Sequence, residues 1–258
     1  MSLIDLLKLP EAKNIDDLDS PSSAVIHKKI IEKKLFLKRT YTDFYKEFKK
    51  ACEEIPQGSI VEIGSGAGFI KEVIPNVITT DLFSSPNVDI VLNGEKLPFE
   101  ENTISAFLLQ NVLHHIKNPT NFFLEANRCL VNGGKIIMIE PHNSLWGAFF
   151  WKNFHHEPFD PNTTWEIKHQ GRLSGANQAL PWIIFFRDRK KFENLFPFLR
   201  IRKLTPHTPL RYLISGGLSI RQLLPSFTYD FVKGIEFILS PFNKYIGMFI
   251  TIEIKKEE

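Results

Sequence analysis

The 258-residue chain has few cysteines and no long apolar segment. Its two cysteines, Cys52 and Cys129, are far apart and lack the spacing of metal ligands, which argues against both a disulfide framework and a zinc site. The chain has no run of about 18 consecutive apolar residues and no basic segment followed by an apolar one near its start, so neither a membrane span nor a secretion signal is expected. We therefore expect a cytoplasmic protein.

The chain also lacks a strong overall charge, since its formal net charge is +3. The charge is unevenly distributed, however: residues 187–258 hold 13 Lys/Arg against 7 Asp/Glu, and residues 26–50 hold 9 against 3. Such segments are either solvated helix faces or surfaces that meet an acidic substrate or an anionic membrane. Nucleic acid is not expected as a partner, because the basic residues alternate with Leu, Ile and Phe.

The hydrophobic pattern changes along the chain. Residues 25–52 place apolar and aromatic side chains at helical spacing between lysines, which predicts one or two amphipathic helices. From Ser59, short β-rich runs alternate with turns and helical segments, the clearest of which is 118–130 with Asn118 as cap and Pro119 in the first turn. This alternation predicts an α/β fold with helices on both faces of a parallel sheet. The β-rich runs are "SIVEI", "NVITTD", "VDIVL", "ISAFLLQ" and "KIIMIE".

The stretch "VEIGSGAGFI" (61–70) clusters three glycines after the first β-rich run. Clustered glycines there favour a tight turn around a bound nucleotide or nucleoside-like cofactor. The dinucleotide pattern G-x-G-x-x-G fails, because Phe69 stands where its third glycine belongs. Glu62, two residues before the first glycine, suits a cofactor that carries positive charge.

This stretch resembles the first motif of class I S-adenosylmethionine-dependent methyltransferases, [E/D]-x-G-x-G-x-G. Later matches follow in the order typical of the type 11-like branch of small-molecule methyltransferases: "ITTD", "LPF", "QNVLHHI", "EANRCL" and "NGGKIIMIEP". The resemblance covers about residues 59–141. It implies a Rossmann-like seven-stranded sheet, with the last strand "GMFITIEIKK" antiparallel, and S-adenosyl-L-methionine as the cofactor.

The resemblance also implies a cofactor site. Asp81 falls on the acid that accepts hydrogen bonds from both ribose hydroxyls, for which a carboxylate is well suited. Asn93 replaces the acid that usually lies near the adenine amino group, and we expect a weaker contact there. Tyr41, in the N-terminal helical segment, is expected at the methionine end. The predicted cofactor-binding residues are Glu62, Gly64, Ser65, Gly66, Gly68, Asp81, Leu82, Asn93, Gly94, Glu95, Gln110, Asn111 and Tyr41.

Histidine is the candidate base if the methyl acceptor must lose a proton, because its pKa lies near neutrality. His114 and His115 follow the fourth strand, where open α/β sheets bind ligands. We favour His115, and we keep His114 and His155 as further candidates, with Glu157 able to orient His155 or His156. No metal is expected, because adjacent histidines do not easily face one ion.

The predicted organisation is an N-terminal helical cap (1–52) and a methyltransferase domain (53–258). The domain contains an aromatic lid insertion (141–186), expected to be irregular, and a second insertion (206–244). The predicted function is transfer of a methyl group to a small-molecule acceptor, with oxygen favoured and the acceptor amphiphilic or acidic: a glycan, a lipid-linked precursor or a secondary metabolite. Two alternatives stay open: a non-catalytic cofactor-binding module, and a peripheral membrane enzyme in which Leu223, Phe231 and Phe237 are exposed.

Overall fold

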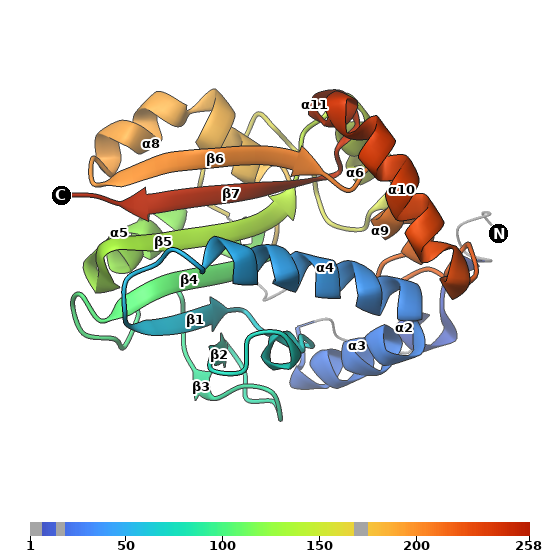
Figure 1. Cartoon of the computed structure of the whole chain (residues 1–258), viewed down its shortest axis with the longest axis horizontal. Helices are drawn as coiled ribbons and strands as arrows, with labels where there is room; N and C mark the ends of the chain where they lie inside the picture. The colour runs from blue at the N-terminus through green and yellow to red at the C-terminus, as the bar shows by residue number, and fades with distance from the viewer. Residues whose placement is uncertain (1–6, 14–18, 168–174) are drawn as a thin grey trace.

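A seven-stranded sheet runs through the molecule (Figure 1). The computed structural model describes residues 7–13, 19–167 and 175–258. The strand order is β3-β2-β1-β4-β5-β7-β6, and only β7 runs antiparallel to its neighbours. The predicted Rossmann-like sheet and its antiparallel last strand are confirmed. The strands are β1 (Ser59–Ile63), β2 (Ile78–Asp81), β3 (Ile90–Val91), β4 (Ile104–Gln110), β5 (Leu130–Pro141), β6 (Leu199–His207) and β7 (Phe249–Lys256).

The central strands carry apolar side chains on both faces. All residues of β4 except Gln110 are buried, and β5 places Ile136, Ile137, Met138 and Ile139 in the core with no exposed surface. A strand that is covered on both faces reads as a continuous apolar run, which is why "ISAFLLQ" and "KIIMIE" were recognisable.

Two helices build most of the N-terminal cap, as the helical spacing of residues 25–52 predicts. They are α3 (Pro21–Lys33) and α4 (Leu35–Ala51), preceded by the short α2 (Pro10–Lys13). Figure 1 shows α4 lying across the near face of the sheet. Its buried side includes Leu37, Phe44 and Phe48, whose apolar surface holds the helix in place.

The glycine loop after β1 does not open an α-helix. It leads into a single 3-10 turn, η1 (Ile70–Glu72). The predicted helix at 118–130 is α5 (Pro119–Cys129), whose cap is Asn118: its side-chain oxygen accepts a hydrogen bond from the Asn121 N–H at 3.2 Å. Between them lies a second 3-10 turn, η2 (Leu113–His115).

The lid insertion is more regular than predicted. Ser144 caps a ten-residue helix, α6 (Leu145–Phe154), by accepting a hydrogen bond from the Gly147 N–H at 2.9 Å. The expectation of an irregular segment was wrong here because aromatic side chains on all sides of α6 hid its period. The insertion closes with α7 (Leu180–Trp182) and the π-turn η3 (Ile183–Arg187), followed by α8 (Arg189–Leu195). Residues 168–174 of the predicted lid lie outside the described residues.

The second insertion is mostly helical and is shifted from its predicted bounds, since β6 continues to His207 and β7 begins at Phe249. These two residues pair directly across the antiparallel ladder. The insertion contains α9 (Arg211–Ser215), η4 (Ser226–Thr228), α10 (Tyr229–Leu239), η5 (Ser240–Phe242) and α11 (Asn243–Ile246). None of the helices in the described ranges is long and apolar enough to cross a bilayer.

The N-terminal cap and the second insertion are joined to each other. The Leu9 N–H donates to the Ser219 carbonyl at 2.9 Å, and the Arg221 N–H donates to the Leu7 carbonyl at 2.8 Å. The Lys34 ammonium group, at the junction of α3 and α4, donates to the Ile220 carbonyl at 2.7 Å. Two segments far apart in the sequence therefore form one wall over the carboxyl edge of the sheet.

Candidate active site

One cavity of 1350 Å³ lies at the carboxyl ends of β1, β2 and β4. All of the predicted site residues line it. On the cofactor side they are Tyr41, Glu62, Gly64, Ser65, Gly66, Gly68, Asp81, Leu82, Asn93, Gly94, Glu95, Gln110 and Asn111, and on the catalytic side His114, His115 and His155. Their roles stay a prediction, but residues from six segments of the chain meet where an open α/β sheet binds ligands.

The glycine loop wraps around the first strand's end in a conformation that needs glycine. Gly64 and Gly66 have φ of 70° and 47°, a region that side chains with a Cβ rarely adopt. The Gly66 N–H donates to Asp81 Oδ2 at 2.8 Å. The loop and the acid at the end of β2 are thereby fixed relative to one another.

Glu62 is a buried carboxyl group that lacks a full set of partners. It is 2% exposed, and its Oε2 atom has no hydrogen-bond partner among the described residues. Burial raises the pKa of Glu62 to about 7, and the neighbouring Asp81 acts in the same direction. A cation bound beside Glu62 would remove this penalty.

The end of β4 presents two further polar groups to the cavity. Gln110 Oε1 and Asn111 Oδ1 are buried without a partner in the described part of the chain, and Asn111 has φ of 56°. Asn93 differs from expectation, because its side-chain oxygen already accepts a hydrogen bond from the Glu95 N–H at 2.9 Å. One lone pair of that oxygen is therefore used within a turn.

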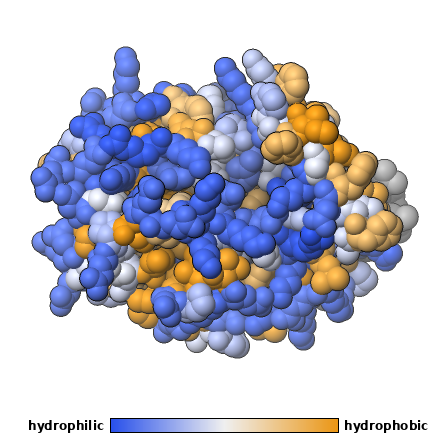
Figure 2. Space-filling model, viewed as in Figure 1, coloured by the Kyte–Doolittle hydropathy of each residue, from blue (hydrophilic) through white to orange (hydrophobic). Residues whose placement is uncertain are grey.

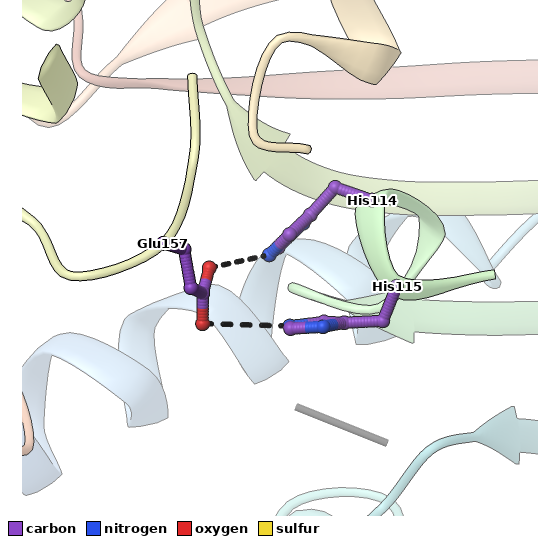
Figure 3. A group of neighbouring side chains, drawn as sticks. All are labelled: His114, His115 and Glu157. Atoms are coloured by element: carbon purple, nitrogen blue, oxygen red, sulfur yellow. Dashed lines mark ion pairs between the residues drawn. The ribbon is translucent and has the colours of Figure 1, made fainter. Parts of the chain in front are cut away.

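His114 lies between two carboxylates, Glu140 and Glu157, and Figure 3 shows its contact with Glu157. Its Nδ1 is 2.6 Å from Glu140 Oε2 and its Nε2 is 3.3 Å from Glu157 Oε2. The first carboxylate is itself fixed, since Glu140 Oε1 accepts the N–H groups of Val112 and Leu113 at 2.8 Å. Burial alone would lower the pKa of His114, but the charge and hydrogen bond of Glu140 outweigh it and raise the pKa to about 9.

His115 packs against His114 with its ring tilted by 40° and faces the same carboxylate. The two ring centres are 4.2 Å apart, and His115 Nε2 is 3.7 Å from Glu157 Oε1 (Figure 3). Burial, and then the charge of His114, lower the pKa of His115 to about 3. At neutral pH this ring is therefore uncharged.

Glu157 is the centre of the histidine cluster. Burial opposes its ionisation, but the hydrogen bond from His114 and the nearby histidines hold its pKa well below the usual range. Gln178 Nε2 donates to Glu157 Oε2 at 2.8 Å and lies 2.8 Å from His155 Nδ1. Burial lowers the pKa of His155 to about 4.

No metal is expected from the sequence because adjacent histidines do not easily face one ion, but the structure does not bear out that reason. The 3-10 turn η2 brings both adjacent rings to one side, so that His114, His115 and Glu157 offer three ligand atoms within 4.8 Å of one another. The absence of a metal stays a prediction.

Three polar residues of the site were not predicted: Glu140, Gln178 and Tyr212. Glu140 ends β5, the strand beside β4, and carboxyl ends of parallel neighbours meet at one edge, so its position could have been inferred. Gln178 and Tyr212 come from the two insertions, and no sequence spacing relates them to the histidines. Tyr212 shares a hydrogen bond with Tyr41.

Residues 61–138, which span β1 to β5, match a family model described as "Methyltransferase domain". The chain contains a class I methyltransferase domain. The family suggested by the sequence is thereby confirmed, and the cofactor of such a domain is S-adenosylmethionine, as predicted.

Relatives of the methyltransferase domain are distant. An uncharacterized protein of Methanocaldococcus jannaschii is 30% identical over 113 residues, which are 40% of this chain and 55% of that protein. The chain thus spans about half the length of this curated relative.

A solved methyltransferase structure has a similar fold. A geranyl diphosphate C-methyltransferase from Streptomyces coelicolor superposes with a TM-score of 0.50 at 15% identity, over 85% of this chain and 77% of that one. A possible histamine N-methyltransferase from Thermotoga maritima gives 0.47 at 16% identity, over 79% and 84%. At these identities the likeness concerns the fold alone.

The residues of the methyltransferase domain fit the cofactor. The Glu62 carboxyl oxygen that lacks a partner among the described residues suits the cofactor's ammonium group, and Asp81 offers a carboxylate where a ribose contact is predicted. A Cβ at Gly66 would come no closer than 3.6 Å to Asp81 and would meet little else, so the loop leaves space beside the acid. Gln110 and Asn111 add polar oxygens that are buried without partners in the described structure.

Proposed function

We propose that this protein transfers a methyl group from S-adenosylmethionine to a hydroxyl group of a small amphiphilic molecule in the cytoplasm. The observation that carries the proposal is the shared cavity: the predicted cofactor loop, three histidines and an aromatic wall line one space of 1350 Å³. A typical pocket for one ligand measures roughly 300–1,000 Å³. The cavity therefore has room for the cofactor and an acceptor together.

S-adenosylmethionine, when bound, supplies a methyl group on a positively charged sulfur. The protein's part is to hold the acceptor oxygen in line with that methyl group and to keep water away. Glu62 and Asp81 would hold the cofactor from the β1 and β2 side. His114 and His115, which follow β4, line the same cavity.

His115 is the histidine best placed to take the acceptor's proton. His114 is held as an imidazolium between Glu140 and Glu157, so it has no free lone pair. His115 is uncharged, and although its basicity is low, the hydroxyl proton becomes strongly acidic as its oxygen gains the methyl carbon. Glu157, 3.7 Å from His115 Nε2, would stabilise the ring once it is protonated. His155 would instead help to position Glu157 through Gln178.

The aromatic side chains of α6 support an amphiphilic acceptor. The cavity that holds the polar groups of the sheet edge is also lined by Trp146, Phe149, Phe150 and Phe154. A molecule with a hydroxylated head and an apolar part, such as a lipid-linked glycan precursor or an apolar secondary metabolite, would match both walls.

The two alternative functions make different demands on the structure. A non-catalytic module calls for a closed cavity or for histidines turned away from it, whereas His114 and His115 line the cavity. A peripheral membrane enzyme requires an exposed second insertion, and Leu223, Phe231 and Phe237 are 47%, 73% and 79% exposed. These observations favour an enzyme and are compatible with membrane contact.

Calorimetric titration with S-adenosylmethionine and with S-adenosylhomocysteine tests the cofactor site. We expect saturable binding of both, and a loss of at least about tenfold in affinity for Asp81→Ala. Asp230→Ala, which removes an exposed carboxylate on α10, is the matched control. A folded wild-type protein that binds neither compound would refute the proposal.

Transfer itself is tested with S-adenosylmethionine carrying a labelled methyl group and extracts of cellular lipids and small molecules. The wild-type protein should label an organic-soluble product, whereas His115→Ala should bind the cofactor normally and label at least about a hundredfold more slowly. Equal rates for both proteins would exclude His115 as the base.

A further inference from the structure

The second insertion presents apolar side chains to solvent along its helical part. We define the α10–α11 surface by its most exposed large apolar residues: Phe227, Phe231, Phe237, Ile238, Phe242 and Tyr245, which are 52–85% exposed. Figure 2 shows hydrophobic residues gathered in the part of this face where α10 and α11 lie in Figure 1. Scattered apolar residues are normal on a protein surface, but a continuous group of this kind marks a contact site.

Helix α10 carries large apolar side chains on its exposed side as well as on its buried side. Its buried side carries Tyr229, Val232 and Glu236, and Glu236 accepts hydrogen bonds from the Leu210 and Arg211 N–H groups at 2.8 and 2.7 Å. The Arg211 guanidinium group contacts Glu236, Asp43 and Tyr229. An ionic cluster therefore holds the helix from inside while Phe231 and Ile238, seven residues apart, face out.

The charges around this surface favour an anionic partner. The carboxylates of the insertion are occupied: Asp230 pairs with Arg39 at 2.6 Å, and Glu236 is buried against Arg211. Lys244, on α11 beside Tyr245, has no carboxylate partner among the described residues, and its ammonium group is 5.8 Å from the Tyr245 ring centre. A basic side chain between exposed aromatic rings suits the interface of a bilayer that contains anionic lipids.

The α10–α11 surface is continuous with the wall of the cavity. α11 contacts α6, on which Phe149 and Phe154 both line the cavity and remain 51% and 44% exposed. Leu223, just before α10, likewise lines the cavity and is 47% exposed. An apolar chain could pass from a membrane into the cavity along these side chains without entering water.

We propose that the α10–α11 surface docks on an anionic lipid bilayer and that the methyl acceptor is an amphiphile drawn from that bilayer. The acceptor's apolar chain would lie against α6, and its hydroxylated head would reach the histidine cluster. The choice of acceptor rests on the function proposed above, whereas docking itself does not. Since no described helix can cross a membrane, the contact is confined to one leaflet.

Co-sedimentation of the full chain with lipid vesicles tests this proposal. We expect the wild-type protein to sediment with phosphatidylcholine vesicles that contain phosphatidylglycerol, and less with phosphatidylcholine alone. The double variant Phe231→Ser with Ile238→Ser should partition at least about tenfold more weakly, because each buried side chain contributes on the order of a tenfold change. Lys244→Gln should reduce only the part of binding that depends on phosphatidylglycerol.

Matched controls are Leu124→Ser and Leu195→Ser, on α5 and α8, which are 53% and 45% exposed and lie at the other end of the molecule (Figure 1). Both should bind vesicles like the wild type. Failure of the wild type to sediment, or equal sedimentation of the double variant, would overturn the proposal. Light scattering provides a further test. If the wild type is a dimer and the double variant is a monomer, the α10–α11 surface contacts a second copy of the chain, and the proposal is overturned.

The same preparations distinguish this proposal from the proposed function. The double variant should bind S-adenosylhomocysteine as the wild type does in calorimetry, since the cofactor residues are on the sheet edge. Loss of vesicle binding with intact cofactor binding would locate the failure in the α10–α11 surface. If the wild type binds vesicles but no cofactor, the docking proposal is supported and the proposed methyl transfer is refuted.

Discussion

His114 is a residue whose charge is set entirely by its neighbours. Two carboxylates, Glu140 and Glu157, contact opposite ring nitrogens of a side chain that is 2% exposed. The pair of histidines is recognisable in the sequence, but their division of roles is not. Which ring is charged depends on Glu140 from β5 and on Glu157 from the lid, and the motif "LHH" contains neither.

We expect His114→Gln to destabilise the protein by about 3–5 kcal/mol at pH 6, because both carboxylates would lose the cation they face in the interior. The folded-state pKa of about 9 lies above the unfolded value of 6.5. The stabilising effect of His114 is therefore complete below pH 6.5 and is lost as the pH rises through 9. Urea unfolding of both proteins at pH 6 and pH 9.5 should show the difference shrinking.

His156→Gln is the control for that comparison, because His156 lies 3.7 Å from the same Glu157 but is half exposed. Its effect on stability should be small at both pH values. A His114→Gln effect that does not change with pH would show that the ring is uncharged in the folded protein.

Glu62 is expected to couple cofactor binding to proton release. Because burial raises its pKa to about 7, it is partly protonated near neutrality, and a bound ammonium group would favour the ionised form. Affinity for S-adenosylmethionine should therefore rise as the pH increases through 7. Calorimetry at pH 7 in phosphate and in Tris should give different apparent binding enthalpies, because the released proton is taken up by different buffers. Glu62→Gln should abolish this difference. Equal enthalpies for the wild type in the two buffers would contradict this role of Glu62.

At the scale of elements, the parallel strands were predictable and the insertions were not. β1, β4 and β5 are covered on both faces, so their sequences are nearly uniform in hydrophobicity and stand out from their surroundings. Helix α10 has apolar residues on both sides: Tyr229 and Val232 are buried with Glu236, whereas Phe231 and Ile238 are exposed. Its hydrophobic pattern therefore does not show which side faces the domain.

The attachment of α10 depends on the Arg211 cluster. Arg211→Met should destabilise the protein by about 3–5 kcal/mol, because Glu236 and Asp43 would lose a shared cation. Arg211→Lys should recover little of that, since one ammonium group cannot serve the carboxylates and Tyr229 in the geometry of a guanidinium fork. Urea unfolding measures both effects, and hydrogen exchange should show faster exchange confined to α9 and α10. If Arg211→Lys has the same free energy of unfolding as the wild type, the positive charge alone accounts for the contribution of Arg211 to stability.

At the scale of the whole molecule, the sheet and the edge at which its strand ends meet follow from the sequence, whereas the closure of the cavity does not. The order of the motifs after β1 fixes which strand ends meet. The second wall, however, forms where the strand-like pairing of Leu7 and Leu9 with Ser219 and Arg221 joins segments about two hundred residues apart. No periodicity in either segment predicts its partner.

Cofactor binding should stabilise the folded protein as a whole. A ligand at 100 times its dissociation constant adds about 2.7 kcal/mol, which for a chain of this size corresponds to a rise of roughly 5–10 °C in Tm. Thermal unfolding followed by circular dichroism should show this rise with S-adenosylmethionine and with S-adenosylhomocysteine. Adenosine triphosphate, which lacks the amino-acid end, should produce a much smaller rise in Tm. An equal rise would show that the site recognises only the nucleoside part of the ligand.

Because His207 pairs with Phe249, the second insertion begins and ends at neighbouring positions of the sheet and can be replaced as a unit. Both ends of the insertion leave the sheet at adjacent positions of one antiparallel ladder, so its length and sequence can change without altering any strand. The predicted cofactor residues lie at the ends of β1, β2 and β4, while Tyr212, Leu218 and Leu223 of the insertion line the same cavity. Residues 208–248 could therefore be exchanged between related proteins, which would change one part of the cavity lining and the exposed helices while the strand ends stay the same.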